Sequence, residues 1–448
     1  MSLPTRFPDR DEVATVRAEA EALEPGQEGE EKRRLAGRVL GRREHGKLAF
    51  LDLVDRSGSI QLLCAEERVG AVTVDLGDIV GVVGSPMRTR RGEPSLAVDE
   101  LALLAKIKRP LPDTFHGLVD TETRYRKRYL DLLVNEEARQ DFLLRTRMVS
   151  EVRRYLDERG FVEVETPILQ PRYGGALAEP FVTHHNELDT DLYLRIADEL
   201  YLKRLIVGGL EKVYEIGKDF RNEGLSTKHQ PEFTMLEWYE AYADYEDTMA
   251  RVEDLVATVA RETIGTTQVT FRDREIDLSP PWRRLRLAEA LEGEGVWTCD
   301  ADELRTRLQG RGVDTTKDAS WGQLVDHALT HLLEPTLNEP TFLYDYPVEL
   351  SPLARRKEGE EGIVERFEYF VGGIELGNAY TELTDPDEQA QRFAEQGGEG
   401  DPDYVEALSY GMPPTGGLGL GIDRLAMVLT GRETIRDVIL FPLLRERD

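Results

Sequence analysis

The alternation of hydrophobic and polar residues changes along the chain. Between residues 8 and 24, Val13, Val16, Ala20 and Leu23 recur near helical spacing and predict a short amphipathic helix. From residue 35 the pattern becomes that of short strands separated by turns rich in Gly, Asp and Ser. The predicted strands cover residues 36–40, 49–54, 60–64, 79–85 and 95–104. Five short strands in one segment predict a small closed barrel, and an OB-fold is one such barrel that binds oligonucleotides.

The pattern beyond residue 110 is that of a larger domain with mixed secondary structure. Periodicity predicts a helix over residues 142–159 and a strand over residues 161–166 that stops at Pro167. Helices and antiparallel-type strands then alternate irregularly, and residues 250–340 are mostly polar and helical in pattern. We therefore expect an α+β protein with three parts. These are an acidic extension (residues 1–30), a barrel (31–108) and a catalytic domain (109–448) with a helical insertion at about 250–340.

Charge is distributed unevenly over these parts. The chain of 448 residues has a formal net charge of −29, yet residues 31–130 contain 19 Lys and Arg against 14 Asp and Glu. A polyanion could therefore bind this segment of an acidic protein, although solvated surface charge explains the same clusters equally well. Two cysteines and no long apolar run exclude a disulfide scaffold and a membrane span, and favour a cytoplasmic protein.

Four segments stand out, at residues 161–176, 213–239, 367–383 and 417–424, and the last three contain residues suited to nucleotide chemistry. A predicted strand runs into Phe220-Arg221-Asn222-Glu223, where an arginine fork could bind a phosphate, and Phe233 offers a ring for a purine. A glycine-rich strand at residues 417–421 precedes Arg424 at the start of a helix. Glu368 and Glu375 supply the oxygen ligands that Mg²⁺ prefers when it bridges nucleotide phosphates. Each element alone is weak, but together and in this order they predict an ATP site that is not a P-loop.

These segments resemble the three motifs of class II aminoacyl-tRNA synthetases. The first motif corresponds to residues 161–167, the second to residues 214–239 and the third to residues 417–427. Residues 180–245 and 344–448 resemble the lysyl subfamily closely, and the similarity covers about residues 32–448. The resemblance implies an antiparallel catalytic sheet flanked by helices, an anticodon-binding OB-fold and a homodimer formed through the first motif.

The resemblance also implies roles for individual residues. Arg221 and Arg424 would be the catalytic arginines on the ATP phosphates, and Glu368 and Glu375 would hold Mg²⁺. The residues implied for ATP are Arg221, Glu223, His229, Phe233, Glu375 and Arg424. Those implied for L-lysine are Gly175, Glu199, Glu237, Tyr239, Asn378, Tyr380 and Glu382. Arg42, Arg43, Phe50 and Gln61 match the barrel face that reads the anticodon, although Phe50 is equally well explained as a core residue of its strand.

Three functional hypotheses follow from this resemblance. The first is a ligase that forms lysyl-adenylate from ATP and lysine and passes lysine to the 3′ end of tRNA(Lys). The second is a paralogue that transfers lysine or an analogue to another acceptor, and the intact barrel argues against it. The third is a catalytically silent module, which the retained Arg221, Arg424, Glu368 and Glu375 disfavour. One departure from the family is Glu179, where the family usually has a basic residue.

Overall fold

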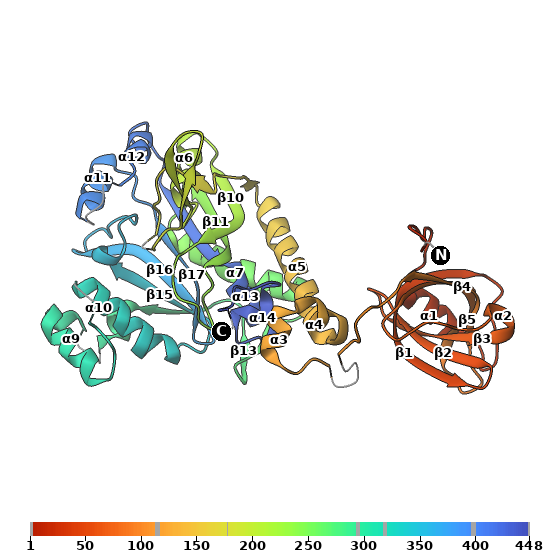
Figure 1. The fold of residues 1–448 in the computed structure, drawn as a ribbon. Coiled ribbons are helices and arrows are strands. Elements are labelled where there is room, and N and C mark those ends of the chain that lie inside the picture. Colours follow the sequence, from red (N-terminus) through yellow and green to blue (C-terminus); the bar gives the residue numbers. More distant parts are fainter. Residues whose placement is uncertain are drawn as a thin grey trace. The chain divides into compact units, whose positions relative to one another are not determined.

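The computed structural model describes residues 3–112, 117–176, 178–292, 296–316, 320–395 and 400–446. The chain folds into two compact units, Met1–Asn135 and Glu136–Asp448 (Figure 1). Among the described residues, no helix is both long enough and apolar enough to cross a membrane.

The first unit contains a closed five-stranded barrel with the strand order β1-β2-β3-β5-β4. Its strands are β1 (Arg33–His45), β2 (Leu48–Val54), β3 (Ser59–Ala65), β4 (Ile79–Arg88) and β5 (Pro94–Ala105). Its helices are α1 (Val13–Glu21), α2 (Glu66–Val69), α3 (Thr121–Arg126) and α4 (Arg128–Val134). Helix α1 buries Val13, Val16 and Ala20 against the barrel. The predicted helix and all five predicted strands are therefore confirmed, and the strands are longer than their hydrophobic runs.

The second unit is organised around an eight-stranded sheet with the order β14-β15-β16-β17-β18-β11-β10-β6. These strands are β6 (Val162–Glu163), β10 (Lys212–Phe220), β11 (Glu232–Ala241), β14 (Arg283–Arg286), β15 (Thr341–Pro347), β16 (Ile363–Val371), β17 (Ile374–Thr381) and β18 (Thr415–Gly421). Neighbours from β15 to β10 pair antiparallel, and only the two outermost pairs, β14 with β15 and β10 with β6, are parallel. The predicted antiparallel sheet is thus confirmed in its centre.

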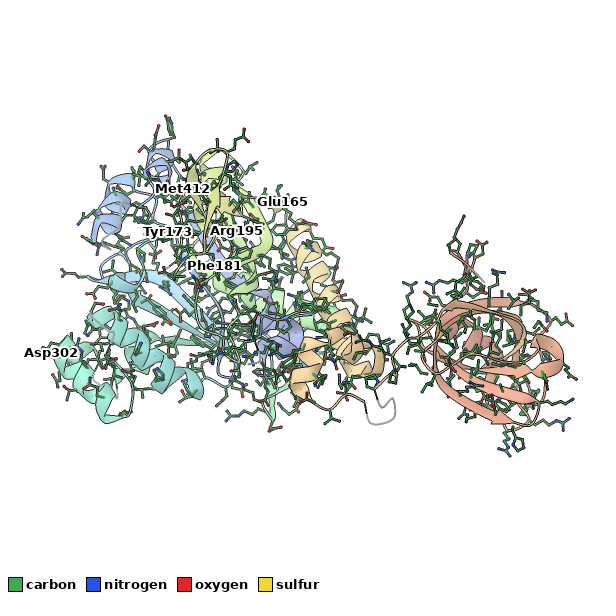
Figure 2. The ribbon with its side chains drawn as sticks, viewed as in Figure 1. Glu165, Tyr173, Phe181, Arg195, Asp302 and Met412 are labelled. Atoms are coloured by element: carbon green, nitrogen blue, oxygen red, sulfur yellow. The ribbon has the colours of Figure 1, made fainter. Side chains whose placement is uncertain are left out.

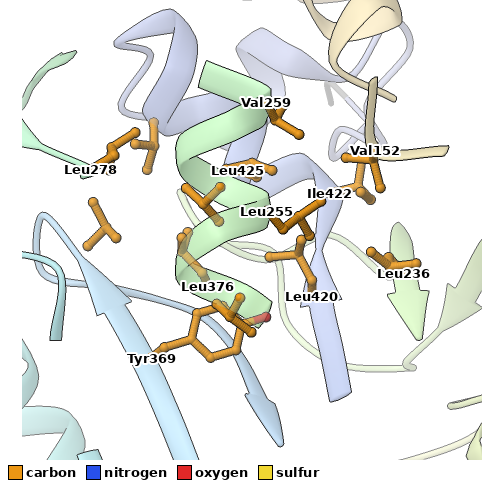
Figure 3. Packing of buried hydrophobic residues seen from close by; sticks show 14 of the residues in the cluster. Val152, Leu236, Leu255, Val259, Leu278, Tyr369, Leu376, Leu420, Ile422 and Leu425 are labelled. Atoms are coloured by element: carbon orange, nitrogen blue, oxygen red, sulfur yellow. The ribbon is translucent and has the colours of Figure 1, made fainter. Parts of the chain in front are cut away.

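Helices cover the sheet and close its core. They are α5 (Glu136–Asp157), α6 (Glu199–Val207), α7 (Tyr245–Ile264), α11 (Pro386–Glu395), α12 (Pro402–Leu408), α13 (Ile422–Thr430) and α14 (Ile435–Val438). Figure 3 shows Leu255 of α7 beside Leu420 of β18 and Ile422 of α13, all within the largest cluster of buried apolar side chains. Burial of this apolar surface is the main stabilisation of the sheet that carries the candidate site.

Two predicted boundaries need correction. The helix predicted over residues 142–159 is α5, which begins six residues earlier and ends at Asp157. The strand predicted over residues 161–166 contains only Val162 and Glu163 in β6. The strand ends early because the Thr166 N–H donates to the side chain of Glu215 (3.0 Å) rather than to a neighbouring strand. Hydrophobic alternation therefore overestimated how far this segment pairs.

The stretch of residues 250–340 is divided between two environments. Its first part continues α7 and then forms β12 (Gln268–Phe271), β13 (Arg274–Asp277) and β14, which joins the large sheet. The rest packs as a second apolar cluster, which includes Leu287, Leu304 and Leu324. Its helices are α8 (Leu287–Ala290), α9 (Ala301–Gly310) and α10 (Trp321–Ala328), with short helical turns at Val296–Thr298, Leu329–Leu333, Glu334–Thr336 and Val348–Leu350. A separate small sheet contains β7 (Leu169–Gln170), β8 (Val182–His185) and β9 (Thr190–Leu194).

Candidate active site

A cavity of about 1060 Å³ lies in the second unit, over one face of the eight-stranded sheet. Backbone pairing aligns Glu237 of β11 with Gly419 of β18, Gly419 with Asn378 of β17, and Asn378 with Glu368 of β16. All four residues line the cavity. Because directly opposed residues of paired strands share a face, this alignment makes the sheet the floor of the cavity.

Side chains of strand β11 set the sequence of predicted binding groups along that floor. Phe233, Met235, Glu237 and Tyr239 alternate along the strand and therefore point to the same face. Successive members are separated by roughly 7 Å, so Phe233 and Tyr239 are roughly 20 Å apart along the strand. The aromatic ring predicted for a purine and the carboxylates predicted for lysine therefore lie in successive regions of one floor.

The region near Phe233 is built from arginines. Arg221 follows directly after β10, and its guanidinium lies over the Phe233 ring, 5.1 Å from the centroid. The buried Nε of Arg221 has no hydrogen-bond partner among the described residues. Arg424, near the start of α13, donates through Nη1 to the carboxylate of Glu375 (2.9 Å) and to the Glu375 carbonyl oxygen (2.7 Å). Two positioned guanidinium groups, one with an unused buried donor, suit the binding of phosphate oxygens.

His229 connects this region to the loop after β10. Its Nε2 lies 3.3 Å from Nη2 of Arg424, and its Nδ1 lies 2.9 Å from the Ser226 hydroxyl. Burial and the charge of Arg424 lower the pKa of His229 to about 4, so the ring is neutral at pH 7 and can accept from the arginine. Glu223 and Glu179 are both exposed, and the carbonyl of Glu179 accepts from the N–H of Asn222 (2.8 Å).

Glu368 and Glu375 both line the cavity. Burial raises the pKa of Glu368 to about 7, and the negative charge of Glu375 adds to this effect, although Arg366 opposes it. Burial alone would also raise the pKa of Glu375, but Arg424 holds it below its ordinary value. The buried carboxylate of Glu368 and the partly buried carboxylate of Glu375 form a hard oxygen donor set that fits a divalent cation.

The region near Tyr239 is rich in carboxylates. Glu199 begins α6, Glu237 lies on β11, and both are buried in the cavity wall. The Tyr239 hydroxyl donates to Glu237 Oε2 (3.2 Å). Gly175 has φ +88°, and a Cβ there would lie 3.0 Å from the Ala197 Cβ and 3.3 Å from the Glu199 Cβ. The left-handed backbone and the close approach both require glycine, which leaves this part of the cavity open in front of Glu199.

Glu382 lies behind the cavity floor, immediately after β17. It is almost completely buried, and its Oε2 forms an ion pair with the ammonium group of Lys203, which also pairs with Glu199. Among the described residues, no hydrogen-bond donor reaches Glu382 Oε1. A Cβ on Gly417, which lines the cavity, would lie 1.9 Å from that oxygen. Glycine at 417 therefore leaves space for the carboxylate directly beneath the floor.

The structure brings most of the residues predicted for the site together. Those that line the cavity are Gly175, Glu199, Arg221, Glu237, Tyr239, Glu368, Glu375, Asn378 and Tyr380. Phe233, His229, Arg424 and Glu382 contact or adjoin lining residues, whereas Glu223 is exposed on the loop.

Three residues of this neighbourhood were not singled out in the sequence. Lys203 follows Glu199 by one helical turn, and this spacing indicates an ion pair within α6. Arg366 precedes Glu368 by two residues on β16, donates to it (2.8 Å) and lines the cavity. Asp198 precedes α6 and is buried with no donor among the described residues within reach of its carboxylate. The first two relations follow from helical and strand spacing, but nothing local predicts the burial of Asp198.

Of the four residues predicted to read the anticodon, three lie on the outer face of the barrel and one points away from it. On β2, Ala49, Leu51 and Leu53 are buried while Phe50 is only partly buried, so Phe50 points outward rather than into the core. Arg43 opposes Phe50 in the β1–β2 pair, and it donates to Asp52 Oδ1 (3.0 Å) and Gln61 Oε1 (3.3 Å). Arg43, Phe50 and Gln61 thus share the outer face.

Arg42 is directed away from that face. It opposes the buried Leu51, and its Nη1 donates to the carbonyl of Val74 (2.7 Å). Adjacent residues of a strand point to opposite faces, which is why Arg42 and Arg43 separate.

Comparisons with known proteins agree with the fold and the site. The family described as "tRNA synthetases class II (D, K and N)" matches residues 120–445, and "OB-fold nucleic acid binding domain" matches residues 34–104. The chain therefore belongs to the class II tRNA synthetases of the D, K and N group, with an N-terminal OB-fold.

Several curated relatives that match most of this chain are lysine–tRNA ligases, one of the subfamilies of that class. The chain is 51% identical to a lysine–tRNA ligase of Moorella thermoacetica, over 92% of this chain and 89% of the relative. It is 48% identical to that of Carboxydothermus hydrogenoformans, over 93% and 89% of the two chains. It is 47% identical to that of Dehalococcoides mccartyi, over 99% and 93%.

Proposed function

We infer that this chain is an ATP-dependent lysine–tRNA ligase, which activates L-lysine as lysyl-adenylate and transfers it to tRNA(Lys). The observation that carries this inference is a cluster of three carboxylates at one end of the cavity. Glu199 and Glu237 line it, and Glu382 lies beneath its floor, where no donor among the described residues hydrogen-bonds to the Oε1 atom below Gly417. Lysine has two ammonium groups, and buried carboxylates are the groups that pair with them. An acidic amino acid would be repelled there.

The pocket charge matches this ligand. Lys203 is the one described cation that pairs with these carboxylates, so once all three are ionised in the lysine complex they carry a formal excess of −2, which matches the two ammonium groups of lysine. We assign Glu199 and Glu237, with Gly175, to the α-amino end, and Glu382 with Tyr239 to the side-chain ammonium. Asn378 and Tyr380 line the same wall and supply polar contacts. Groups of this kind reject an uncharged analogue because they would be left unpaired.

Activation is a displacement at phosphorus, in which the lysine carboxylate attacks the α-phosphate of ATP and pyrophosphate leaves. In this proposal no side chain acts as a nucleophile. Arg221 and Arg424 bind phosphate oxygens and stabilise the charge that develops there, and the order of residues along β11 aligns lysine with the nucleotide. Phe233 offers its ring to the adenine, with His229 and Glu223 at the nucleotide end.

Glu368 and Glu375 are the residues that would hold a divalent cation, for which we propose Mg²⁺. The cation would neutralise phosphate charge and orient the pyrophosphate leaving group. Within the chain, Arg366 and Arg424 each donate to one of these carboxylates, and so fix their orientation before a cation binds.

The barrel supplies the contact with tRNA in this proposal. Residues 31–108 are the anticodon-binding domain and residues 109–448 the catalytic domain. Phe50 on the outer face would stack on a base, while Arg43 and Gln61 on the same face would contact the anticodon stem-loop. Arg42 points away from that face, so we assign it no contact with the anticodon. We also propose a homodimer, on the resemblance of the first motif alone, and a cytoplasmic location, on the low number of cysteines.

Charging of tRNA tests this function directly. The full chain is incubated with ATP, Mg²⁺, L-lysine and total tRNA, and the aminoacylated species is identified by mass spectrometry and by hybridisation to tRNA-specific probes. Lysine attached to tRNA(Lys) supports the proposal. Charging with another amino acid, or transfer of lysine to protein without charging of tRNA, would contradict it.

A further inference from the structure

A group of three buried carboxyl side chains lies behind the wall that carries Glu237. One oxygen of each of Asp198, Asp219 and Glu237 lies within 4.8 Å of those of the other two. Their exposed fractions are 1%, 0% and 7%. Only Glu237 reaches the cavity, and Asp198 and Asp219 lie deeper, before α6 and on β10. The group therefore connects a predicted lysine-binding carboxylate to the interior of the protein.

The surrounding charges do not balance this group. Arg195, labelled in Figure 2, donates to Glu215 Oε1 (2.6 Å) and lies 3.2 Å from Asp219 Oδ1. Other titratable groups that act on the three carboxyls are Glu199, Glu215, Arg221, Tyr239 and Tyr380. Arg195 is the only described cation in direct contact, and Glu215 already shares it. An excess of negative charge in a low-dielectric interior is costly unless protons neutralise part of it.

Among the three carboxyls, Asp198 shows the lack of compensating partners most clearly. Both of its carboxylate oxygens are buried, and among the described residues no donor hydrogen-bonds to either of them. Its neighbours are the two other carboxyls, which cannot donate while ionised. A carboxylic acid can donate to a carboxylate, so one proton between Asp198 and Glu237 satisfies both groups. Burial and the neighbouring negative charges accordingly raise the pKa of both residues well above their ordinary values.

We propose that Asp198 and Glu237 share one proton in the free protein, and that lysine expels this proton when its ammonium group binds Glu237. The proposal rests on the proposed function and names Asp198 as a positioning residue for the lysine site. The step balances: an O–H bond of the pair breaks, the proton leaves through the cavity that Glu237 lines, and the ammonium replaces its positive charge. Lysine binding is therefore coupled to the release of up to one proton.

A proton explains this group better than a metal ion does. The guanidinium of Arg195 lies against Asp219 and repels a second cation. Mg²⁺ also demands a near-octahedral shell of oxygen ligands, and two of the three carboxyls do not reach the cavity from which waters would complete it.

The proposal fixes how lysine affinity depends on pH. The lysine-free protein holds the shared proton, whereas the lysine ammonium binds to the pair of Asp198 and Glu237 only after that proton has left. The dissociation constant for lysine therefore falls about tenfold per pH unit as pH rises toward the pKa of the pair, and levels off above it. Asp198→Asn removes one of the two carboxyls, keeps the size of the side chain, and moves this dependence to lower pH.

Isothermal titration calorimetry on the full chain tests the coupling. L-lysine is titrated at pH 6, 7 and 8 in buffers whose ionisation enthalpies differ, and the slope of the observed heat against that enthalpy counts the protons released. We expect release of up to one proton by the wild type and a loss of at least half of it in Asp198→Asn. Asp345→Asn removes a buried carboxyl that pairs with Lys357 away from the cavity, and should leave the release unchanged.

The outcomes separate the inference from the proposed function. Lysine binding without proton release at any of the three pH values overturns the shared proton and leaves the proposed function intact. Proton release that persists undiminished in Asp198→Asn also overturns the shared proton. So does binding of Mg²⁺ or Mn²⁺ to the wild type in the absence of lysine, if Asp198→Asn abolishes that binding. If the wild type does not bind lysine, both fail. If Asp198→Asn does not fold, the wild-type proton count and the same titration of Asp219→Asn, expected to release fewer protons, decide.

Discussion

The ammonium group of Lys203 on α6 forms an ion pair with Glu382, which follows β17, beneath the floor of the cavity. Lys203 is fully buried and pairs with Glu199 as well. Burial alone would lower the pKa of Lys203, but Glu199 and Glu382 raise it, so the group remains charged. The protein thus places its own lysine ammonium between two carboxylates that we assign to substrate lysine, and thereby fixes their orientation before the substrate binds.

Glu382→Gln should raise the KM for lysine steeply with little change in the KM for ATP. The substitution removes one carboxylate charge from a buried site and leaves the side-chain ammonium of bound lysine partly unpaired. This loss costs roughly 2–5 kcal/mol, or about 30- to 5000-fold in lysine affinity. Steady-state pyrophosphate exchange measures both constants. Glu240→Gln is the matched control, because Glu240 is buried on the same sheet but pairs with Arg251 and Lys212 outside the cavity. Equal effects on lysine and ATP would assign Glu382 a structural role only.

Arg424→Ala should abolish adenylate formation in a folded protein. The guanidinium stabilises phosphate charge in the transition state, and loss of one such donor costs about 3–4 kcal/mol. Lysine-dependent pyrophosphate exchange measures the loss. Arg432→Ala is the control, since Arg432 follows the same helix but pairs with Asp141 (2.6 Å) away from the cavity. Near-normal exchange by a folded Arg424→Ala variant would exclude the phosphate role.

Gly175→Ala should weaken lysine binding beyond its effect on stability. The left-handed backbone at 175 (φ +88°) strains alanine by about 1 kcal/mol, and the new Cβ would press on Ala197 and Glu199. Gly209→Ala provides the matched control, because Gly209 has φ +93° and no atom within 4 Å of the added Cβ. Thermal melts should fall alike, while only Gly175→Ala raises the lysine KM. A rise of the same size in both variants would contradict the geometry.

Phe50→Ala should lower tRNA charging without changing lysine activation. Base stacking on an aromatic side chain contributes about 1–3 kcal/mol, so kcat/KM for tRNA should fall roughly 5- to 150-fold. Val83→Ala, on β4 of the same barrel and also only partly buried, should leave kcat/KM for tRNA unchanged. If charging by Phe50→Ala equals that of the wild type, this barrel face does not contact the anticodon.

Asp219→Asn should flatten the pH dependence of stability. Burial raises the pKa of Asp219 to about 6, above its ordinary value near 4, so the folded protein retains a proton that the unfolded chain has lost. This contribution to stability is full below pH 4 and is lost as pH rises through 6, by at most about 3 kcal/mol. Urea unfolding at pH 4.5, 5.5 and 7 should show the loss in the wild type and less of it in the variant. Equal slopes would show that Asp219 does not titrate in this range.

The barrel was predictable because its strands follow local periodicity, whereas the residues of the catalytic floor were predicted from motifs that resemble those of class II synthetases. Two-residue alternation located all five barrel strands, and the motif around Arg221 located the end of β10. The same alternation failed for residues 161–166, where the side chain of Glu215 takes the Thr166 N–H that a longer strand would have paired.

Contacts between distant segments could not be predicted in the same way. The pairing of Lys203 with Glu382 joins α6 to the end of β17, and the group of Asp198, Asp219 and Glu237 joins three elements. Neither leaves a periodic trace in the sequence. The separation of Arg42 from Arg43 is different, since strand alternation implies it once β1 is known to continue to His45.

Amino-acid-dependent exchange of pyrophosphate into ATP tests the central claim most directly. The purified full chain is incubated with ATP, Mg²⁺ and labelled pyrophosphate, and each of the twenty amino acids is supplied in turn without tRNA. The pocket of Glu199, Glu237 and Glu382 predicts exchange with lysine that exceeds exchange with every other amino acid by at least 100-fold. Exchange driven best by aspartate or asparagine, or no exchange with lysine by a folded protein, would contradict it.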